Sequence, residues 1–388
     1  MKRYLTPTVA ALQPSGIRKF FDLVSTKKNI ISLGVGEPDF VTPWTIRESA
    51  IFSLEQGQTM YTSNAGLLEL RQELSNYLSA HMGVRYRPEG ELLITVGASE
   101  AVDLAMRALT GPGDAVLIPE PSYVSYVPCA LLAGAEARYV STSAANEFRL
   151  TVEDLEKVYT PNAKLLVLSY PNNPTGAIMR REDLLRIAEF VEAHDLLVLA
   201  DEVYADLTYA AEPHTAFASL PGMRSRTLHV SSFSKSYAMT GWRVGYVAGH
   251  ADILQGMLKI HQYIIMCASK MSQMAALEAL RSAENAKREM IAAYDRRRRF
   301  MVDGFRQMGL DCFEPLGAFY VFPGIQRTGL SSEEFVNTLL EEENVAAVAG
   351  TAFGPSGEGH IRCSYACSLE QLEEALTRIG RFVRRRLA

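Results

Sequence analysis

Cysteine is scarce in this chain and shows no pairing pattern. The 388 residues contain five cysteines, and no two of them form a C-x-x-C pair. An odd number of cysteines without such spacing is not typical of a disulfide framework. His360, Cys363 and Cys367 lie close together in sequence, but their spacing matches no zinc-binding pattern, and we predict no metal site.

Long apolar runs and an excess of one charge are also missing. No segment approaches the ~20 apolar residues that span a membrane, and the apolar run between Pro7 and Pro14 is too short for a signal peptide. The net charge is −5, which attracts neither nucleic acid nor an anionic membrane. The basic runs 296–299 and 384–386 are typical of solvated helix faces. We therefore expect a cytoplasmic protein without nucleic-acid or membrane partners.

The middle of the chain alternates between strand-like and helix-like patterns. Short apolar runs of strand length occur at 92–96, 115–118, 164–168, 196–199, 227–230 and 244–247. Helical patterns such as 100–109 and 181–194 fill most of the gaps between them. Continuous apolar strands separated by helices predict an α/β fold with a mostly parallel sheet covered by helices on both faces.

The pattern changes near residue 282. A long charged helical pattern runs from there to about 308, and further helices are predicted at 332–343 and 369–385. This favours a smaller α+β domain. We predict three parts: an N-terminal segment that packs with the small domain (1–45), a large cofactor-binding domain (46–283) and a small C-terminal domain (284–388).

Five of the predicted strands end in residues suited to chemistry. Ligands of such sheets bind beyond the carboxyl ends of the strands. The residues that follow these strands are Gly97-Ala98-Ser99, Ser122-Tyr123, Asn173, Asp201 with Tyr204, and Ser231–Lys235. Any one of these sets is compatible with an ordinary loop, but five at one sheet edge favour a cofactor cleft.

The stretch 227–249, TLHVSSFSKSYAMTGWRVGYVAG, narrows the choice of cofactor. Lys235 lies between two serines just beyond a strand, and Arg243 follows eight residues later. An amine in this position suits a Schiff base, while the serine hydroxyls and the guanidinium suit a phosphate. Pyridoxal phosphate needs both. On its own, the stretch is also compatible with a surface loop that carries a solvated lysine.

Several motifs together resemble one known family. They are GEPDF, YTSNAG, NNPTG, DEVY, SFSK with Arg243 eight residues after the lysine, GAFY, and the arginine of HIRCSYA. This combination resembles the class I/II aminotransferases of pyridoxal-phosphate fold type I, enzymes of amino-acid metabolism. The resemblance covers roughly residues 15–385 and is closest to the aromatic and aspartate-type subgroup.

The resemblance implies a role for each candidate catalytic residue. Lys235 would carry the cofactor as a Schiff base and move the substrate's α-proton. Asp201 would pair with the pyridine nitrogen, so that the ring stays protonated and withdraws electrons. Tyr204 and Asn173 would hydrogen-bond the phenolic oxygen, and Tyr123 would stack on the ring. In isolation, Asn173 is also compatible with a turn, and Tyr123 with core packing.

The resemblance also implies which residues bind the phosphate and the substrate. The residues expected to hold the phosphate are Gly97, Ala98, Ser99, Ser232, Ser234 and Arg243, with backbone N–H groups at a helix start. Tyr61 would reach the phosphate of a partner subunit, which implies a homodimer with shared sites. Arg362 would bind the α-carboxylate. Gly36, Asn173 and Ile17 would also contact the substrate, with Ile17 in a lid.

The side-chain specificity of the substrate depends on a different stretch of the chain. Aspartate-type members present an arginine from the stretch corresponding to 257–266, and this chain has none there. Lys259 and His261 are candidates to replace it, unless both face solvent, and Tyr263 falls near the arginine's position. An aromatic donor is thus favoured over aspartate. The resemblance implies a 2-oxo acid acceptor, 2-oxoglutarate, and a ping-pong mechanism.

Two alternatives belong to other functional classes. Carbon–sulfur β-lyases and γ-elimination enzymes such as aminocyclopropane-carboxylate synthase share Lys235, Asp201 and Arg362. A non-catalytic regulator with this fold would carry an N-terminal DNA-binding domain, for which we expect no room before the fold begins.

Overall fold

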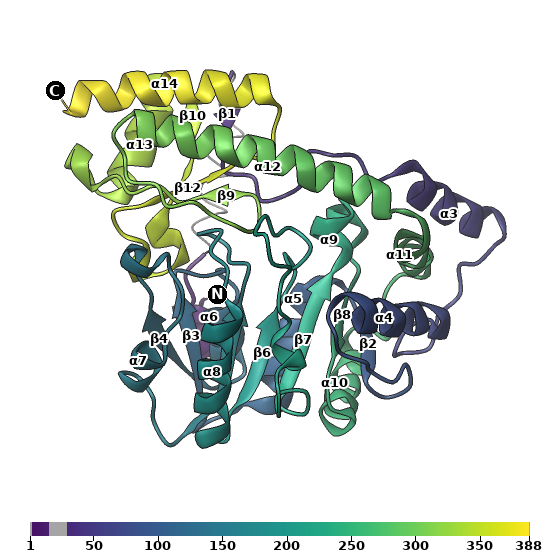
Figure 1. Ribbon diagram of the computed structural model, residues 1–388. Coiled ribbons are helices and arrows are strands. Elements are labelled where there is room, and N and C mark those ends of the chain that lie inside the picture. The colour runs from purple at the N-terminus through teal and green to yellow at the C-terminus, as the bar shows by residue number, and fades with distance from the viewer. Residues whose placement is uncertain (1, 15–28, 388) are drawn as a thin grey trace.

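The structure is a computed structural model that describes residues 2–14 and 29–387 (Figure 1). Its centre is a seven-stranded sheet with the order β2-β8-β7-β6-β5-β3-β4. The strands are β2 (Leu92–Thr95), β3 (Ala115–Glu120), β4 (Glu136–Ser141), β5 (Ala163–Ser169), β6 (Leu197–Asp201), β7 (Thr227–Ser232) and β8 (Gly245–Ala248). Strand β8 runs antiparallel to β2 and β7, and the other pairings are parallel. The predicted, mostly parallel sheet is confirmed.

Helices cover both faces of this sheet, which explains why its strands are continuously apolar. Helices α5 (Gly97–Leu109), α6 (Tyr126–Leu132) and α10 (Ala251–Ile264) pack on one face. On the other face lie α4 (Leu68–His81), α8 (Arg181–Ala193) and α11 (Lys270–Ser282). The short helix α7 (Val152–Glu156) follows β4 in the chain, and α9 (Phe233–Ser236) follows β7 directly.

A second layer of structure lies over the carboxyl ends of the strands, at the top of Figure 1. A three-stranded antiparallel sheet joins β11 (Val348–Ala349), β12 (Ile361–Ser364) and β9 (Tyr320–Val321). Helices α12 (Glu284–Gln307), α13 (Ser332–Glu343) and α14 (Leu369–Leu387) pack around one apolar core with these strands. Strand β1 (Ile31–Ser32) pairs in parallel with β10 (Val345–Ala346), so residues near 31 lie beside the C-terminal third of the chain.

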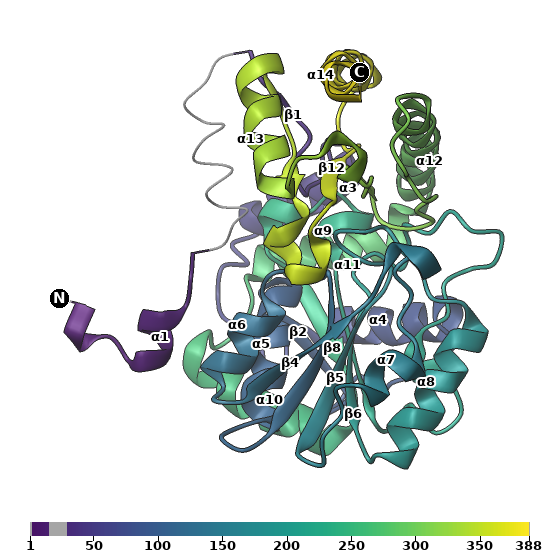
Figure 2. The ribbon, with the colours of Figure 1, turned by 90° about the vertical axis from the view of Figure 1, so that its left-hand side faces the viewer.

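The remaining helices lie at the periphery. Helix α3 (Trp44–Glu55) packs on α11, and α1 (Pro7–Ala11) lies beside α6 at the edge of the molecule (Figure 2). Short 3-10 helices occur at Lys2–Tyr4, Ala144–Asn146, Phe217–Ser219, Thr240–Trp242, Gln326–Thr328, Gly350–Phe353 and Pro355–Gly357. In the described ranges, no helix combines the length and apolarity needed to cross a bilayer.

The sequence patterns located six of the seven strands and missed β4. This strand lies at the sheet edge, and much of it is exposed, so it lacks the continuous apolar run that marks the others. The helices expected near 332–343 and 369–385 are α13 and α14. Ile17 and the helical pattern around it lie outside the described residues. The divisions after residues 45 and 283 remain a proposal.

Candidate active site

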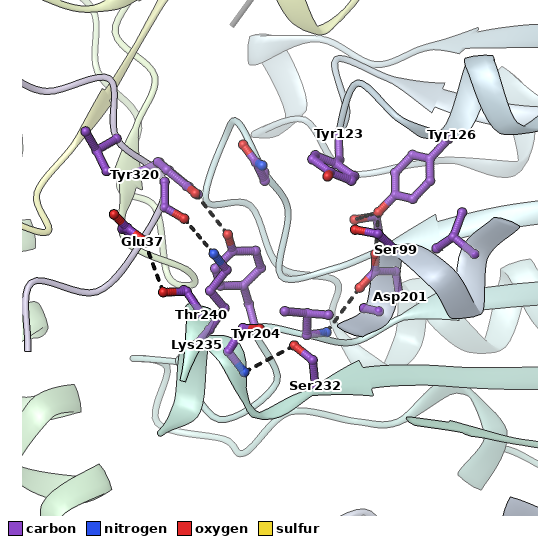
Figure 3. A pocket seen from close by; sticks show the side chains of 18 of the residues that line it. Glu37, Ser99, Tyr123, Tyr126, Asp201, Tyr204, Ser232, Lys235, Thr240 and Tyr320 are labelled. Carbon is purple, nitrogen blue, oxygen red and sulfur yellow. Dashed lines mark hydrogen bonds between the residues drawn. The ribbon is translucent and has the colours of Figure 1, made fainter. Parts of the chain in front are cut away.

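A cavity of about 480 Å³ lies at the carboxyl ends of the central strands, below the C-terminal layer. The predicted site residues that line it are Gly36, Ala98, Ser99, Tyr123, Asn173, Asp201, Tyr204, Ser232, Ser234, Lys235, Arg243 and Arg362. Figure 3 shows the side chains of Lys235, Asp201 and Tyr204 directed into this space from different elements. The fold therefore brings together residues that are 326 positions apart in sequence.

Lys235 projects from the one-turn helix α9 toward the loop that follows β1. Its Nζ donates a hydrogen bond to the carbonyl oxygen of Gly36 at 2.5 Å and lies 5.8 Å from the ring centre of Phe319. Burial lowers the pKa of Lys235 to about 8, Glu37 opposes this effect, and the Arg362 guanidinium adds to it. A neutral amine is therefore accessible near neutral pH, as a nucleophile or proton acceptor requires.

Asp201 is the last residue of β6 and lies deep in the cavity. Its Oδ2 accepts a hydrogen bond from the Tyr126 hydroxyl at 2.7 Å, and its Oδ1 accepts one from the Val203 N–H at 3.2 Å. The Tyr126 hydroxyl also lies 2.8 Å from Ser169 Oγ. Burial raises the pKa of Asp201, and the Tyr126 hydrogen bond opposes this shift. The carboxylate is thus fixed in one orientation toward the cavity.

A second group of residues forms a small cradle between α5 and the end of β7. Ser232 caps α9, and its Oγ accepts a hydrogen bond from the Ser234 N–H at 3.3 Å. Arg243 donates to the carbonyl oxygen of Thr240 at 3.0 Å. Gly97, with φ of +75°, opens α5, and a Cβ there would lie 2.6 Å from Arg243 Nη2. Glycine therefore permits this close approach of the guanidinium to the helix start.

Arg362 is held at the opposite end of the cavity and is only 2 % exposed. It donates from Nη1 to Asn173 Oδ1 at 2.9 Å and from Nη2 to the carbonyl oxygen of Gly34 at 2.6 Å. Its guanidinium carbon lies 4.5 Å from the ring centre of Tyr320. The Tyr320 hydroxyl lies 2.9 Å from that of Tyr204. Strand β12 thus places a fixed cation opposite Lys235, where a carboxylate of a small ligand would fit.

Comparison with known proteins decides the family. The model of the family "Aminotransferase class I and II" matches residues 28–379. The chain belongs to the class I and II aminotransferases. An aspartate aminotransferase of Pyrococcus abyssi is 44% identical over 96% of this chain and 96% of its own length. The aromatic-amino-acid aminotransferase 2 of Thermococcus litoralis is 42% identical over 98% of both chains. The crystal structure of an aromatic aminotransferase from Pyrococcus horikoshii OT3 superposes with a TM-score of 0.91 at 43% identity, covering 95% of this chain and 100% of that one.

Aminotransferases of this class are pyridoxal-phosphate-dependent transaminases, and the cavity fits this cofactor. It contains a buried lysine whose pKa is lowered, a buried carboxylate suited to a pyridinium nitrogen, and an arginine beside a glycine-opened helix start suited to a phosphate. Pyridoxal phosphate requires these three functions at separate ends of one ring.

Five predicted residues do not line this cavity or lie outside the described residues, and one of them, Gly97, opens α5 beside Arg243. Tyr61 is 79 % exposed and does not line it, and Ile17 lies outside the described residues. Lys259 is exposed on α10. His261 is fully buried, with Nδ1 2.7 Å from Glu100 Oε1, and does not line the cavity, so the solvent-facing alternative left open for it does not apply. Its ring lies under α10 because Glu100 on α5 binds it there.

Sequence reasoning missed several residues of the aminotransferase cavity. Tyr126 and Tyr320 line it and fix Asp201 and Tyr204, and Glu37 accepts a hydrogen bond from Thr240 at 3.0 Å. Tyr320 and Glu37 belong to the GAFY and GEPDF motifs, which offered a signal. Tyr126 lies three residues after Tyr123 at the start of a short helix that the sequence patterns did not indicate.

Proposed function

We propose that this aminotransferase moves the amino group of an L-amino acid, preferably an aromatic one, to 2-oxoglutarate by a ping-pong mechanism. In that order the first amino acid leaves as its 2-oxo acid before the second 2-oxo acid binds. The observation that carries the preference is the set of charges around the cavity. Within the described ranges, its lining cations are Lys235, Arg243 and Arg362.

Each of these cations has a task other than binding a second substrate carboxylate. Lys235 acts on the amino group and α-proton, Arg243 holds the phosphate, and Arg362 holds the α-carboxylate. Lys259 and His261 do not line the cavity. For the amino donor, an uncharged, aromatic side chain therefore fits the remaining space better than a carboxylate. The distal carboxylate of 2-oxoglutarate must then be bound by groups other than these three cations. Aspartate is the second candidate, because one relative at 44% identity is named an aspartate aminotransferase.

The residues act as follows in this proposal. Pyridoxal phosphate, when bound, withdraws electrons from the substrate's α-carbon and stores the amino group between the two half-reactions. The Lys235 amine accepts the α-proton and later returns a proton. Asp201 keeps the pyridine nitrogen protonated, as an ion pair in this buried position allows. Tyr204 and Asn173 donate hydrogen bonds to the phenolic oxygen.

The other site residues position the two ends of the reactants. Tyr123 packs on the cofactor ring. The hydroxyl and backbone N–H groups that hold the phosphate with Arg243 belong to Gly97, Ala98, Ser99, Ser232 and Ser234. Arg362 orients the α-carboxylate through its planar fork, with the backbone of Gly36 close by. Ile17 remains a proposed lid residue.

We also propose that the protein is a cytoplasmic homodimer in which Tyr61 completes the partner's site. Tyr61 and Tyr263 are 79 % and 86 % exposed. Their segments lie close together, because Gln273 donates to both Thr62 Oγ1 at 3.2 Å and the Ala268 carbonyl at 2.9 Å. Large, exposed aromatic side chains in neighbouring segments favour a protein interface.

Subunit complementation tests this arrangement. A mixture of the inactive Lys235→Ala and Tyr61→Ala variants should regain activity after subunit exchange, because some dimers then contain one site with both native residues. A monomeric mass in solution, or a mixture no more active than its components, contradicts the shared site.

The first experiment is an absorbance spectrum of the protein loaded with pyridoxal phosphate, before and after L-phenylalanine or L-tyrosine is added without an oxo acid. We expect the visible band to convert to the shorter-wavelength band of the aminated cofactor. A band that responds to aspartate but to neither aromatic donor contradicts the substrate preference. Release of pyruvate and ammonia without an acceptor indicates a β-lyase, and a band unchanged by every amino acid indicates a non-catalytic binding protein.

A further inference from the structure

Glu202 follows Asp201 at the end of β6, and the two side chains lie on opposite faces of the sheet. Successive side chains of a strand alternate between faces. Asp201 contacts Tyr126 of α6 on the cavity face. Glu202 points to the other face, where Phe217 packs, and is only 3 % exposed. A second buried carboxylate therefore lies directly behind the one that faces the cofactor pocket.

Two histidines contact this second carboxylate. Glu202 Oε2 lies 2.9 Å from His214 Nε2 and 3.2 Å from His229 Nδ1. Glu202 Oε1 accepts a hydrogen bond from the Phe217 N–H at 3.0 Å. His229 belongs to β7, is 2 % exposed, and pairs in register with Ala200, two residues before Glu202. We refer to Glu202, His214 and His229 as the Glu202 cluster.

The other ionisable groups around the Glu202 cluster do not offset its charge. Tyr86 and Tyr246 face it, and burial raises the pKa of each phenol well above neutrality, so both stay uncharged. The guanidinium of Arg224 lies over the Tyr86 ring and is bonded to Glu91 at 2.9 Å. Among the residues that the structure describes, the two histidines are therefore the groups placed to compensate the Glu202 carboxylate. An uncompensated buried carboxylate is costly. Burial raises the pKa of Glu202, but His229 and His214 outweigh this effect and hold that pKa well below its usual range.

The charge of this cluster is coupled to Asp201. Burial is the main reason that the pKa of Asp201 is raised; the Glu202 carboxylate raises it further, and His229 opposes that increase. A cluster with a protonated imidazole is neutral and leaves Asp201 ionised. A cluster with two neutral imidazoles carries a negative charge, which favours protonation of Asp201.

We propose that the Glu202 cluster is a positioning and charge-compensating device that keeps the Asp201 carboxylate ionised where it faces the cofactor. His229 and His214 act through Glu202 and Asp201 and do not touch the cofactor themselves. This inference rests on the proposed role of Asp201 as the partner of the pyridine nitrogen. It adds two histidines on the far face of the sheet to the residues that control the cofactor's electronic state.

The test first removes the two imidazoles that compensate the Glu202 carboxylate and then removes the charge of that carboxylate. In the double variant His214→Gln/His229→Gln, the carboxylate of Glu202 stays without a cation. In the triple variant, Glu202→Gln is added. We measure the dissociation constant of pyridoxal phosphate from the apoprotein and the pH midpoint of the visible band in the loaded protein, so neither readout depends on turnover.

We expect the double variant to bind the cofactor about tenfold more weakly and to raise the pH midpoint by about one unit, because one uncompensated buried charge near an ionisable group shifts its pKa by an amount of this order. The triple variant should regain the wild-type dissociation constant and pH midpoint, because residue 202 then carries no charge that needs compensation. If the histidines have only a structural role, the triple variant should be further from wild type than the double variant in both values, since a third substitution in the same core would destabilise the fold further. Unchanged values in the double variant, or a triple variant no better than the double, overturn the proposal.

Three further variants cover other outcomes. If the double variant does not fold, the pair His229→Gln and Glu202→Gln/His229→Gln makes the same comparison with one histidine left in place. Glu343→Gln is the matched control, because Glu343 is also buried and bonded to two cations, Arg381 and Arg385, but lies between α13 and α14. Glu343→Gln should lower the thermal unfolding midpoint without shifting the pH midpoint of the visible band. A wild-type protein without any visible band contradicts the proposed function itself, whereas a midpoint shared by all variants contradicts the cluster alone.

Discussion

Substitution of Arg362 offers a direct test of how the substrate is bound. The guanidinium is fixed by Asn173 Oδ1, the Gly34 carbonyl oxygen and the rings of Tyr320 and Phe353, whose centres lie 4.5 and 4.8 Å from its carbon. It therefore offers a planar fork that needs little reorganisation when a carboxylate binds. Arg362→Lys keeps the positive charge and removes the fork, and Arg362→Ala removes both.

The size of the effect follows from the hydrogen bonds that are lost. A hydrogen bond to a charged group contributes about 1.5–3 kcal/mol. Loss of both bonds of a bidentate pair in Arg362→Ala costs about 3–6 kcal/mol, or roughly 10²- to 10⁴-fold in kcat/KM for the amino acid. Arg362→Lys retains one point-charge contact, so its loss should be roughly 10- to 10²-fold.

The assay separates substrate use from cofactor binding. Single-turnover conversion of the visible band gives kcat/KM for the amino-acid half-reaction, and titration of the apoprotein gives the dissociation constant of pyridoxal phosphate. Arg243→Lys is the matched control, because it should weaken cofactor binding more than the amino-acid half-reaction. If Arg362→Ala weakens cofactor binding as much as amino-acid use, the assigned role of Arg362 is wrong.

Three shorter predictions concern the other end of the cavity. Lys235→Ala should abolish transamination and still unfold cooperatively in a thermal scan; near-full turnover in this variant would contradict the proposed mechanism. Because folding lowers the pKa of Lys235 from 10.5 to about 8, the unfolded chain binds more protons between these values, and the stability of the apoprotein relative to Lys235→Ala should rise with pH across that window. If the thermal midpoint of the apoprotein minus that of Lys235→Ala falls or stays constant as the pH rises across this window, the predicted direction is wrong. Tyr126→Phe removes a hydrogen bond to the Asp201 carboxylate, so it should favour protonation of Asp201 and raise the pH midpoint of the visible band, as a spectrophotometric titration would reveal.

Several of the site residues that the sequence predicted lie at or just beyond strand ends. Asp201 ends β6, and Lys235 lies three residues beyond the end of β7. Both strands are buried on two faces, so their apolar runs have sharp ends, and the rule that ligands bind at carboxyl ends places the next residues in one cleft. The helix predicted at 332–343 is α13, and in the structure a capping box of Ser331 and Glu334 marks its start.

The residues that sequence reasoning missed depend on contacts between distant elements. Tyr126 acts on Asp201 across 75 positions, and Tyr320 acts on Tyr204 across 116. A tyrosine in an apolar stretch has the same local pattern whether its hydroxyl meets a catalytic carboxylate or a backbone carbonyl. His261 shows the same dependence, since the sequence left both a site role and a solvent-facing position open, and only the position of Glu100 on α5 shows the contact of the buried imidazole.

The two ends of the cavity depend on different sheets. Asp201, Ser232 and Lys235 are placed by the seven-stranded sheet, whereas Arg362 is placed by β12 of the smaller sheet. The loop after β1 joins the two ends. Leu33 bonds to Ala346 of β10 through its N–H and to Ser364 of β12 through its carbonyl oxygen.

From this anchored position, the carbonyl oxygens of Gly34 and Gly36 accept hydrogen bonds from Arg362 and Lys235. One short loop thus contacts both the arginine proposed for the α-carboxylate and the lysine proposed for the α-proton. A shift of the C-terminal layer against the central sheet must move these two contacts together. The distance between the carboxylate site and the reacting amine is therefore controlled by the packing of β1 against β10 and β12 and is not fixed by either sheet alone.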